Sequence, residues 1–271
     1  MDLPAPRKLT LASYRYLAGY LLGATTPSVL MLLAGLAIPA GASLVAAMTI
    51  AAFYLRYWRG HKLATRHLGS APVEIVEAPD LHLEVLALVE KSGQRLPEIW
   101  SYRGAGASGV SYPGGRIIVL GQALVAPFWR LNETANDFWR ARLRAAVAHE
   151  LGHLRYNDAL IGCAFACAVV ALESLLLASL LAAGAWPVAV AIAISGGVVL
   201  GLAQIKLQRL MEDRADDYAL ALTDEPQALA DLLIEMEEGA SRAERYRGWA
   251  LPNLGHPPLR HRLARIARDR N

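Results

Sequence analysis

The feature that most constrains this chain is a long run without charged residues near its N-terminus. From Leu17 to Leu55, 39 residues, the sequence contains no Asp, Glu, Lys or Arg. As a helix this run would be about 58 Å long at about 1.5 Å per residue, whereas the hydrocarbon core of a bilayer is about 30 Å thick. One span is therefore too few. The turn signal Ile-Pro-Ala-Gly at 38–41 predicts two spans, near residues 17–38 and 41–57.

A second apolar stretch, residues 159–205, contains a single charged residue, Glu173. Its turn signal at 183–187 predicts spans near 159–183 and 187–206. The composition agrees, because 55% of the residues are hydrophobic and 19% are charged, against about 45–50% and about 25% in soluble domains. Two long stretches, each interrupted once near its centre, favour four transmembrane helices in two hairpins over buried helices of a soluble core.

The distribution of basic residues predicts the orientation in the membrane. Lys and Arg lie before the first span, after the second and after the fourth, at Arg7, Lys8, Arg15, Arg56, Arg59, Lys62, Arg66, Lys206, Arg209 and Arg214. The two hairpin tips contain none. By the positive-inside rule, both termini and the segment between the hairpins face the cytoplasm, as in a multi-pass protein of the inner membrane. The net charge of +3 is too small to indicate a nucleic-acid partner, so the lipid bilayer is the expected surroundings.

The chain is therefore expected to be a mainly α membrane protein with a cytoplasmic α+β domain that the second hairpin interrupts. The predicted divisions are a first hairpin at 1–57, a first part of the domain at 58–158, a second hairpin at 159–206 and a second part at 207–271. Apolar residues at helical spacing predict helices that begin near residues 80, 136, 225 and 258. Extended pieces between residues 97 and 120 predict a small hairpin or a three-stranded sheet.

The helix predicted from about residue 136 contains the pattern HExxH, as His-Glu-Leu-Gly-His at 149–153. Residues four apart lie on one face of a helix, so His149 and His153 are spaced to hold one metal ion. Glu150 is placed to act on a metal-bound water without being a ligand. The alternative is a surface helix with two solvated histidines, because short patterns of this kind also occur by chance.

A zinc hydrolase needs a third protein ligand, and the candidate is Glu212. Asp216 lies four residues later, so both carboxylates project from one helix face. One of the two can bind zinc while the other accepts the free N–H of a ligand histidine. Asp213 and Asp217 are local rivals, and all four acids could instead solvate a helix that leaves the membrane.

Three motifs in this order resemble the HtpX-type membrane zinc metalloproteases, to which the CAAX prenyl proteases are distantly related. The chain has HELGH on a helix before a membrane hairpin, an ExxxD element at Glu212 and Asp216, and a His-Pro element at His256 followed by Arg262. The order of two spans, catalytic helix, two spans, third ligand and His-Pro loop is also that of the family.

This resemblance implies a zinc-dependent endopeptidase of the gluzincin type, with one catalytic Zn²⁺. His149, His153 and Glu212 would be the ligands and Glu150 the general base. His256 would lie near the substrate and stabilise the oxyanion, whereas Arg262 is expected to have a structural role.

The resemblance also implies a polypeptide substrate, such as a membrane-associated or misfolded protein. The family's Asn-Ala-Phe-Ala-like strand is replaced here by Gly104, Ala105, Gly106 and Ala107, which lack the Asn and the aromatic side chain. This strand could still bind a peptide through its backbone. The alternatives are a prenyl-protein-type protease and a non-proteolytic zinc-stabilised membrane scaffold or sensor. The sequence sets no oligomeric state.

Glu173 falls near the middle of the third predicted span. An ionisable group at that depth is energetically expensive and is usually functional or paired. By their depth in the other spans, Ser28, Ser43 and Ser195 are candidate neighbours.

Overall fold

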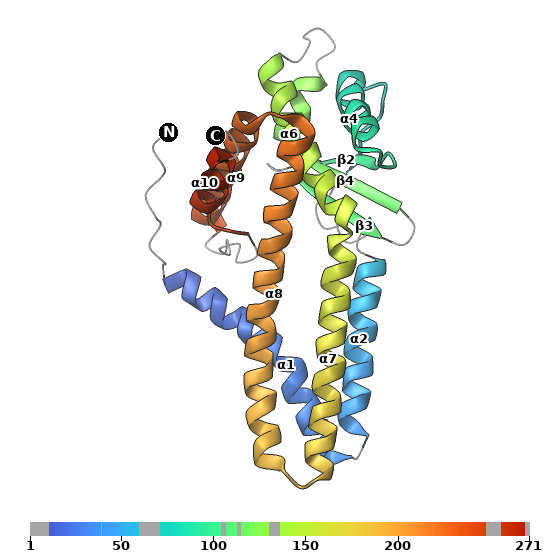
Figure 1. Ribbon diagram of the computed structural model, residues 1–271, viewed down its shortest axis with the longest axis vertical. Coiled ribbons are helices and arrows are strands. Elements are labelled where there is room, and N and C mark those ends of the chain that lie inside the picture. The colour runs from blue at the N-terminus through green and yellow to red at the C-terminus, as the bar shows by residue number, and fades with distance from the viewer. Residues whose placement is uncertain are drawn as a thin grey trace.

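The computed structural model describes residues 11–38, 40–59, 71–103, 107–112, 115–129, 136–247 and 256–268. These residues form an elongated molecule with two parts. One end is a bundle of long helices, and the other contains a small sheet covered by shorter helices (Figure 1). Each part has its own hydrophobic core.

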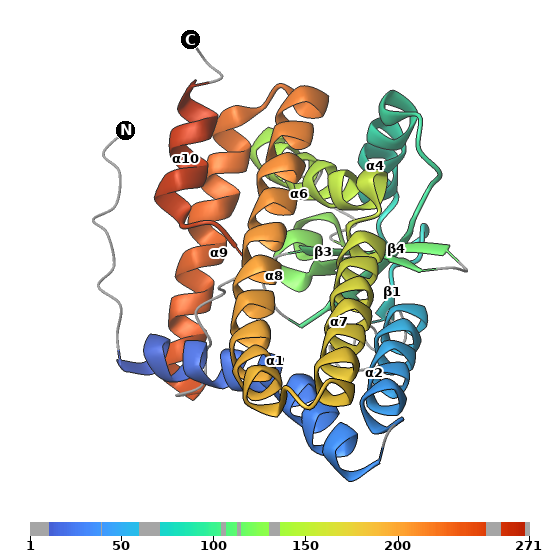
Figure 2. The same ribbon diagram turned by 60° about the horizontal axis from the view of Figure 1, so that its bottom comes forward.

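Four helices make the bundle: α1 (Leu11–Ala37), α2 (Gly41–Trp58), α7 (Asp158–Ala182) and α8 (Trp186–Thr223). They break where the sequence predicts, and Gly184 in the second break has a φ of 70°, which glycine adopts without strain. α2 runs beside α7, whereas α1 crosses the α7–α8 hairpin obliquely (Figures 1 and 2). α8 continues far beyond the predicted span and enters the second part of the molecule (Figure 1).

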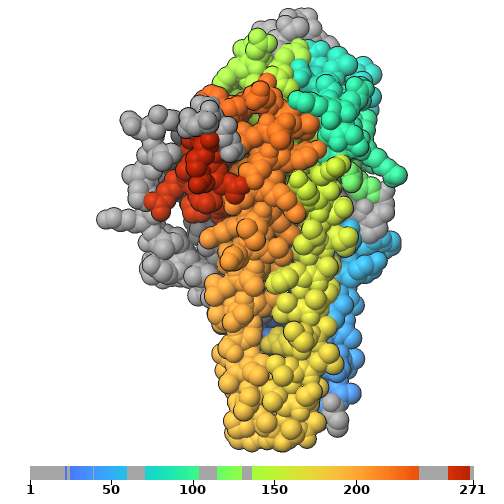
Figure 3. Space-filling model, viewed as in Figure 1, coloured from blue at the N-terminus to red at the C-terminus, as the bar shows by residue number. Residues whose placement is uncertain are grey.

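Among the described residues, α7 and α8 are the two helices that are long and apolar enough to cross a membrane. Only 22% and 28% of their most apolar stretches are buried, which is unlike the core helix of a soluble protein. Leu172, Leu175 and Val199 are 69%, 66% and 63% exposed. These two helices form the narrow end of the molecule in Figure 3. The crossing of the bilayer by all four helices stays a prediction.

The carboxyl group of Glu173 on α7 makes a contact to another helix of the bundle. Ser28 of α1 donates a hydrogen bond of 2.9 Å to Oε2 of Glu173, and both residues are buried. One of the three serines expected from depth is thus a neighbour of Glu173. Ser195 instead donates to the Ala191 carbonyl of its own helix.

Within the described residues the sheet has four strands, where the sequence predicts a small hairpin or a three-stranded sheet. They are β1 (Ala71–Pro72), β2 (Glu98–Tyr102), β3 (Ala107–Tyr112) and β4 (Gly115–Gly121), in the order β1-β2-β4-β3. β3 and β4 form the expected hairpin, β2 pairs parallel to β4, and β1 adds antiparallel to β2. The sequence gives no signal for β1, because two residues are too few for an alternating pattern. β3 lies at an edge of this sheet as described.

Helices cover the sheet and bring the motifs together. They are α4 (Pro79–Ser92), α5 (Gln122–Val125), the 3₁₀ helix η1 (Ala126–Phe128), α6 (Asp137–Tyr156), α9 (Pro226–Arg247) and α10 (Leu259–Arg268). The Asn136 side chain caps α6 by accepting a hydrogen bond from the Trp139 N–H. Leu143, Val147, Leu151 and Leu154 of α6 are fully buried in the core. α6 is therefore the central helix of this part, and α8 packs along it.

Candidate metal centre

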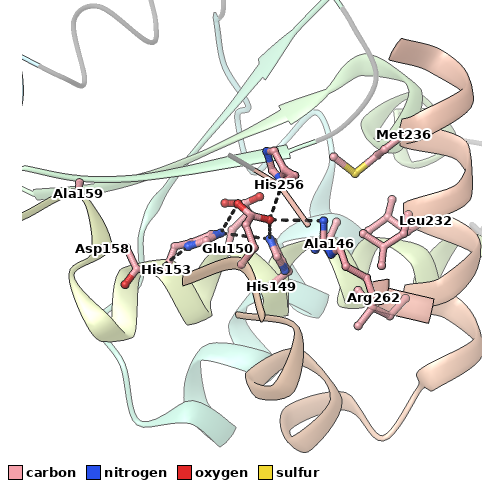
Figure 4. Close-up of a pocket in the computed structure, with 13 residues that line it drawn as sticks. Ala146, His149, Glu150, His153, Asp158, Ala159, Leu232, Met236, His256 and Arg262 are labelled. Carbon is pink, nitrogen blue, oxygen red and sulfur yellow. Dashed lines mark hydrogen bonds and ion pairs between the residues drawn. The ribbon is translucent and has the colours of Figure 1, made fainter. Parts of the chain in front are cut away.

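The HExxH residues lie on α6 with their side chains toward a single point. The Nε2 atoms of His149 and His153 are 3.1 Å apart, and the two rings meet edge to face. Glu150 is 5% exposed and lines the same cavity (Figure 4). A surface helix with two solvated histidines is therefore not what the chain forms.

The α7–α8 hairpin returns α8 to this point and brings Glu212 to the histidines. Its carboxylate oxygens lie 3.6 Å from Nε2 of His149 and 3.6 Å from Nε2 of His153. One ligand atom from each of these three residues lies within 4.8 Å of the other two. Two ligands about 2.1 Å from a tetrahedral zinc ion are about 3.4 Å apart. The donor set and its spacing thus fit one zinc ion.

The two rival acids face away from the histidines. Asp213 lies 2.9 Å from Nη1 of Arg265 on α10, and Asp217 pairs with the same guanidinium. Both acids belong to a surface between α8 and α10. Among the described residues, His149, His153 and Glu212 are the group that could hold a metal.

The predicted partner of Glu212, Asp216, contacts a histidine and an arginine. Oδ1 of Asp216 lies 3.0 Å from Nδ1 of His149. Arg262 of α10 donates two hydrogen bonds to the same carboxylate, of 2.6 and 2.5 Å. Arg262 and Asp216 are 5% and 3% exposed, so this ion pair is buried and shielded from solvent. Arg262, which the resemblance implies to be structural, therefore holds the carboxylate that faces the candidate ligand His149.

His153, the other candidate ligand histidine, has an acidic neighbour that the sequence analysis missed. Nδ1 of His153 donates a hydrogen bond of 2.7 Å to Oδ2 of Asp158, the first residue of α7. The other carboxylate oxygen of Asp158 pairs with Arg214 of α8. The available signal was the position of Asp158 five residues after His153, immediately beyond the end of the catalytic helix.

Charges around the cluster shift several pKa values. Burial by itself raises the pKa of Glu212, but the hydrogen bond from His256 and the charges of His149 and Arg262 outweigh it and lower that pKa to about 2. Burial also opposes ionisation of Asp216, yet the hydrogen bonds from Arg262 and His149 hold its pKa below its usual range. Both carboxylates are therefore ionised at neutral pH, as a metal site requires.

The pKa of His153 is shifted in the opposite direction, upward. Burial lowers its pKa, but the hydrogen bond to Asp158 and the carboxylates of Glu150 and Glu212 outweigh burial and raise the pKa to about 9. The three carboxylates of Glu150, Glu212 and Asp158 thus favour the positively charged form of His153.

Of the remaining predicted site residues, only some lie within the described part of the chain, and His256 is the one that contacts a candidate ligand. Nδ1 of His256 lies 2.7 Å from Oε2 of Glu212, so this histidine touches the third candidate ligand. Its side chain is 36% exposed at the cavity. Ala107 is the first residue of β3, whereas Gly104, Ala105 and Gly106 lie outside the described residues.

The cavity has a volume of about 310 Å³ and two chemically different sides. The candidate metal ligands and His256 form one side. Apolar residues of α9, among them Leu232 and Met236, form the other (Figure 4). This side of α9 carries the regularly spaced apolar residues that predicted an amphipathic helix there. The cavity thus presents an apolar surface beside the candidate metal ligands.

A helix with two histidines, a glutamate from a second helix and a further glutamate beside the histidines are typical of a metallopeptidase. The model of Peptidase family M48 matches residues 77–270, and the chain belongs to this family.

Among curated proteins, the chain is 27% identical over 252 residues to a "Protease HtpX homolog" of Pseudarthrobacter chlorophenolicus, covering 83% of this chain and 84% of the relative. It is 28% identical over 262 residues to the "Protease HtpX homolog" of Acidiphilium cryptum, covering 84% and 86%. The HtpX-type resemblance is thereby confirmed. The chain is a metalloprotease of this type and acts on polypeptides.

Proposed function

We propose that this chain is an integral membrane endopeptidase that uses one zinc ion and the carboxylate of Glu150. The observation that carries the proposal is the convergence of His149, His153 and Glu212, whose ligand atoms lie within 4.8 Å of one another beside Glu150. Three protein ligands with a further position left for water are typical of a catalytic zinc site, whereas a structural site has four.

The residues of the chain then have distinct tasks. Zinc bound at the three ligands would polarise the scissile carbonyl and acidify a water molecule. Glu150, which is buried at the cavity, accepts a proton from the attacking water and donates it to the nitrogen of the leaving amine. His256 is partly exposed at the cavity and supplies a hydrogen bond to the oxyanion, while its Nδ1 faces Glu212.

The substrate would lie between the sheet and α9. β3, an edge strand of the described sheet, would offer backbone hydrogen bonds to an extended peptide, as edge strands do in peptide-binding proteins. The apolar wall formed by Leu232 and Met236 favours an apolar side chain next to the scissile bond. Membrane-associated or misfolded proteins expose such segments, so they are the substrate class that we propose.

The membrane arrangement is part of the same proposal. α1, α2, α7 and α8 would each cross the inner membrane, with both termini and the catalytic part in the cytoplasm. Single cysteines introduced at Leu36 and Trp186, near the hairpin tips, should react with an impermeant reagent from outside intact cells. A cysteine at Glu90 of α4 should not. Outside labelling at residue 90 would contradict the orientation.

The zinc and the base are tested together with the full chain purified in detergent. The wild type should contain one zinc ion and cleave casein. Glu150→Gln should keep the zinc and lose turnover by several orders of magnitude, because only the base is removed. Glu90→Gln, an exposed helix glutamate, is the matched control and should behave as wild type. Zinc binding without cleavage by the wild type would favour a scaffold or sensor, and cleavage limited to prenylated C-termini would favour a prenyl-protein-type protease.

A further inference from the structure

Each candidate ligand histidine has a carboxylate next to its Nδ1 atom, and an arginine contacts that carboxylate. Nδ1 of His149 faces Asp216, and Arg262 holds that carboxylate. Nδ1 of His153 faces Asp158, and Arg214 holds that carboxylate. The first arrangement involves the ExxxD and His-Pro motifs, whereas the second uses residues that belong to neither motif.

The connection between α6 and α7 places Asp158 behind His153. α6 ends at Tyr156, Asn157 adopts a left-handed conformation with φ of 52° and ψ of 44°, and α7 begins at once with Asp158. Asn is among the few residues that adopt this conformation readily. The single-residue turn changes the chain direction, so the Asp158 carboxylate lies beside the imidazole of the preceding helix (Figure 4).

Asp158 is buried, and its carboxylate has two partners. Its side chain is 8% exposed, and its two oxygens contact His153 and Arg214 separately. The Arg214 guanidinium also lies over the ring of Tyr156, 4.1 Å from its centroid. Such stacking fixes the plane of the guanidinium and hence the direction of its hydrogen bonds. Asp158 therefore has one orientation in which both partners are satisfied.

We infer that Asp158, held by Arg214, is a positioning residue for the zinc ligand His153. The inference rests on the proposed zinc function. A carboxylate that accepts the Nδ1 proton of a ligand histidine leaves the Nε2 lone pair free for the metal and fixes the ring orientation. Because Asp158 is the first residue of α7 and Arg214 lies on α8, the α7–α8 hairpin helps to build the metal centre as well as to anchor it.

A simpler role for Asp158 would be that of any acid in the first turn of a helix, where it interacts with the helix dipole. The chain provides a matched control for this role. Asp137 is the acidic residue in the first turn of α6 and is exposed. Replacing either residue by Asn removes one charge from a helix N-terminus, but only Asp158 touches a ligand histidine.

The test measures zinc affinity by competition with a chelator, together with the thermal midpoint, for the full chain in detergent. Asp158→Asn should weaken zinc binding about 10–100-fold, the usual effect of losing such a partner, and Asp137→Asn should not. Arg214→Gln should weaken binding less, because Asp158 keeps its contact with His153. The double variant Asp158→Asn/Arg214→Gln should resemble Asp158→Asn alone, since residues that act in series are not additive.

The outcomes separate this inference from the proposed function. If the wild type binds no zinc, both the proposed function and this inference are wrong. If the wild type binds zinc and both Asp158→Asn and Arg214→Gln bind it as tightly as Asp137→Asn, only the inference is wrong. If Asp158→Asn does not fold, a normal zinc affinity of the folded Arg214→Gln protein would overturn the part assigned to Arg214.

Discussion

Gly152 lies inside the HELGH sequence, and its substitution by alanine tests how closely α6 and α8 must approach. A Cβ atom at Gly152 would lie 3.0 Å from Cα of Ala215 and 3.3 Å from its carbonyl oxygen. Ala215 is fully buried in α8, between the candidate ligand Glu212 and Asp216. The obstacle is backbone, so it cannot rotate away as the end of a long side chain could.

The magnitude follows from two opposing effects. Alanine favours the interior of a helix over glycine by about 1 kcal/mol, which would make Gly152→Ala stabilising in open space. Carbon atoms in contact are ordinarily about 3.5–4.0 Å apart, so the helices must separate by about 0.5 Å. Overpacking of this kind costs about 1–3 kcal/mol. The expected net loss of stability is thus about 0–2 kcal/mol.

The separation should affect zinc more clearly than it affects folding. It moves Glu212 away from His149 and His153 by about 0.5 Å, the limit that preorganised sites tolerate. We expect zinc affinity to fall about tenfold, equivalent to about 1.4 kcal/mol.

Chelator competition and thermal unfolding in detergent measure both effects. The matched control is Gly162→Ala on α7, where the nearest atom would be Nε2 of Gln204 at an ordinary 3.7 Å. This control should keep its zinc affinity. A Gly152→Ala protein with raised thermal stability and unchanged zinc affinity would refute the close approach of α6 and α8.

Three further predictions concern other parts of the molecule. Gly197→Ala would place Cβ 2.5 Å from Cα of Thr25, so the variant should unfold in detergent at a lower temperature than wild type; an unchanged midpoint would contradict the α1–α8 packing. The zinc-free protein should lose stability as pH rises from about 6.5 to 9, because folding raises the pKa of His153 to about 9. The charged His153 stabilises the folded state fully below the unfolded-state pKa of about 6.5, and this contribution disappears as pH rises through the interval. With zinc removed by a chelator, the thermal midpoints of wild type and His153→Gln should therefore converge as pH rises. A difference that stays constant with pH would contradict the raised pKa of His153. His256→Ala should retain zinc but lose about 100–1,000-fold in kcat, as when an oxyanion donor is removed; loss of zinc in a metal assay would instead make His256 part of the metal site.

Local patterns in the sequence predicted the helices and the central motif. The charge-free stretches and their Pro- and Gly-containing interruptions marked α1, α2, α7 and α8, because these signals depend only on neighbouring residues. Asn136 before an apolar repeat marked the start of α6. The spacing of His149 and His153 placed them on one face, because helix geometry alone determines it.

The choice among the acids of α8 depended on tertiary structure. Glu212, Asp213, Asp216 and Asp217 lie close together along one helix, and their spacing pairs Glu212 with Asp216 as readily as Asp213 with Asp217. Packing of α8 against α6 turns the first pair toward the histidines, whereas packing of α10 takes up the second pair. No local pattern encodes which face of a helix meets a segment more than 50 residues away.

The surroundings of the second histidine were likewise decided by the fold. Asp158 faces His153 because Asn157, in a left-handed conformation, changes the chain direction between α6 and α7. Arg214 reaches Asp158, which lies 56 positions earlier in the chain, because α8 packs back against α7. In the sequence these residues read as a helix end and a basic flank of a membrane span. Their role depends on distances of a few ångströms between segments far apart in the chain, which only the packed helices determine.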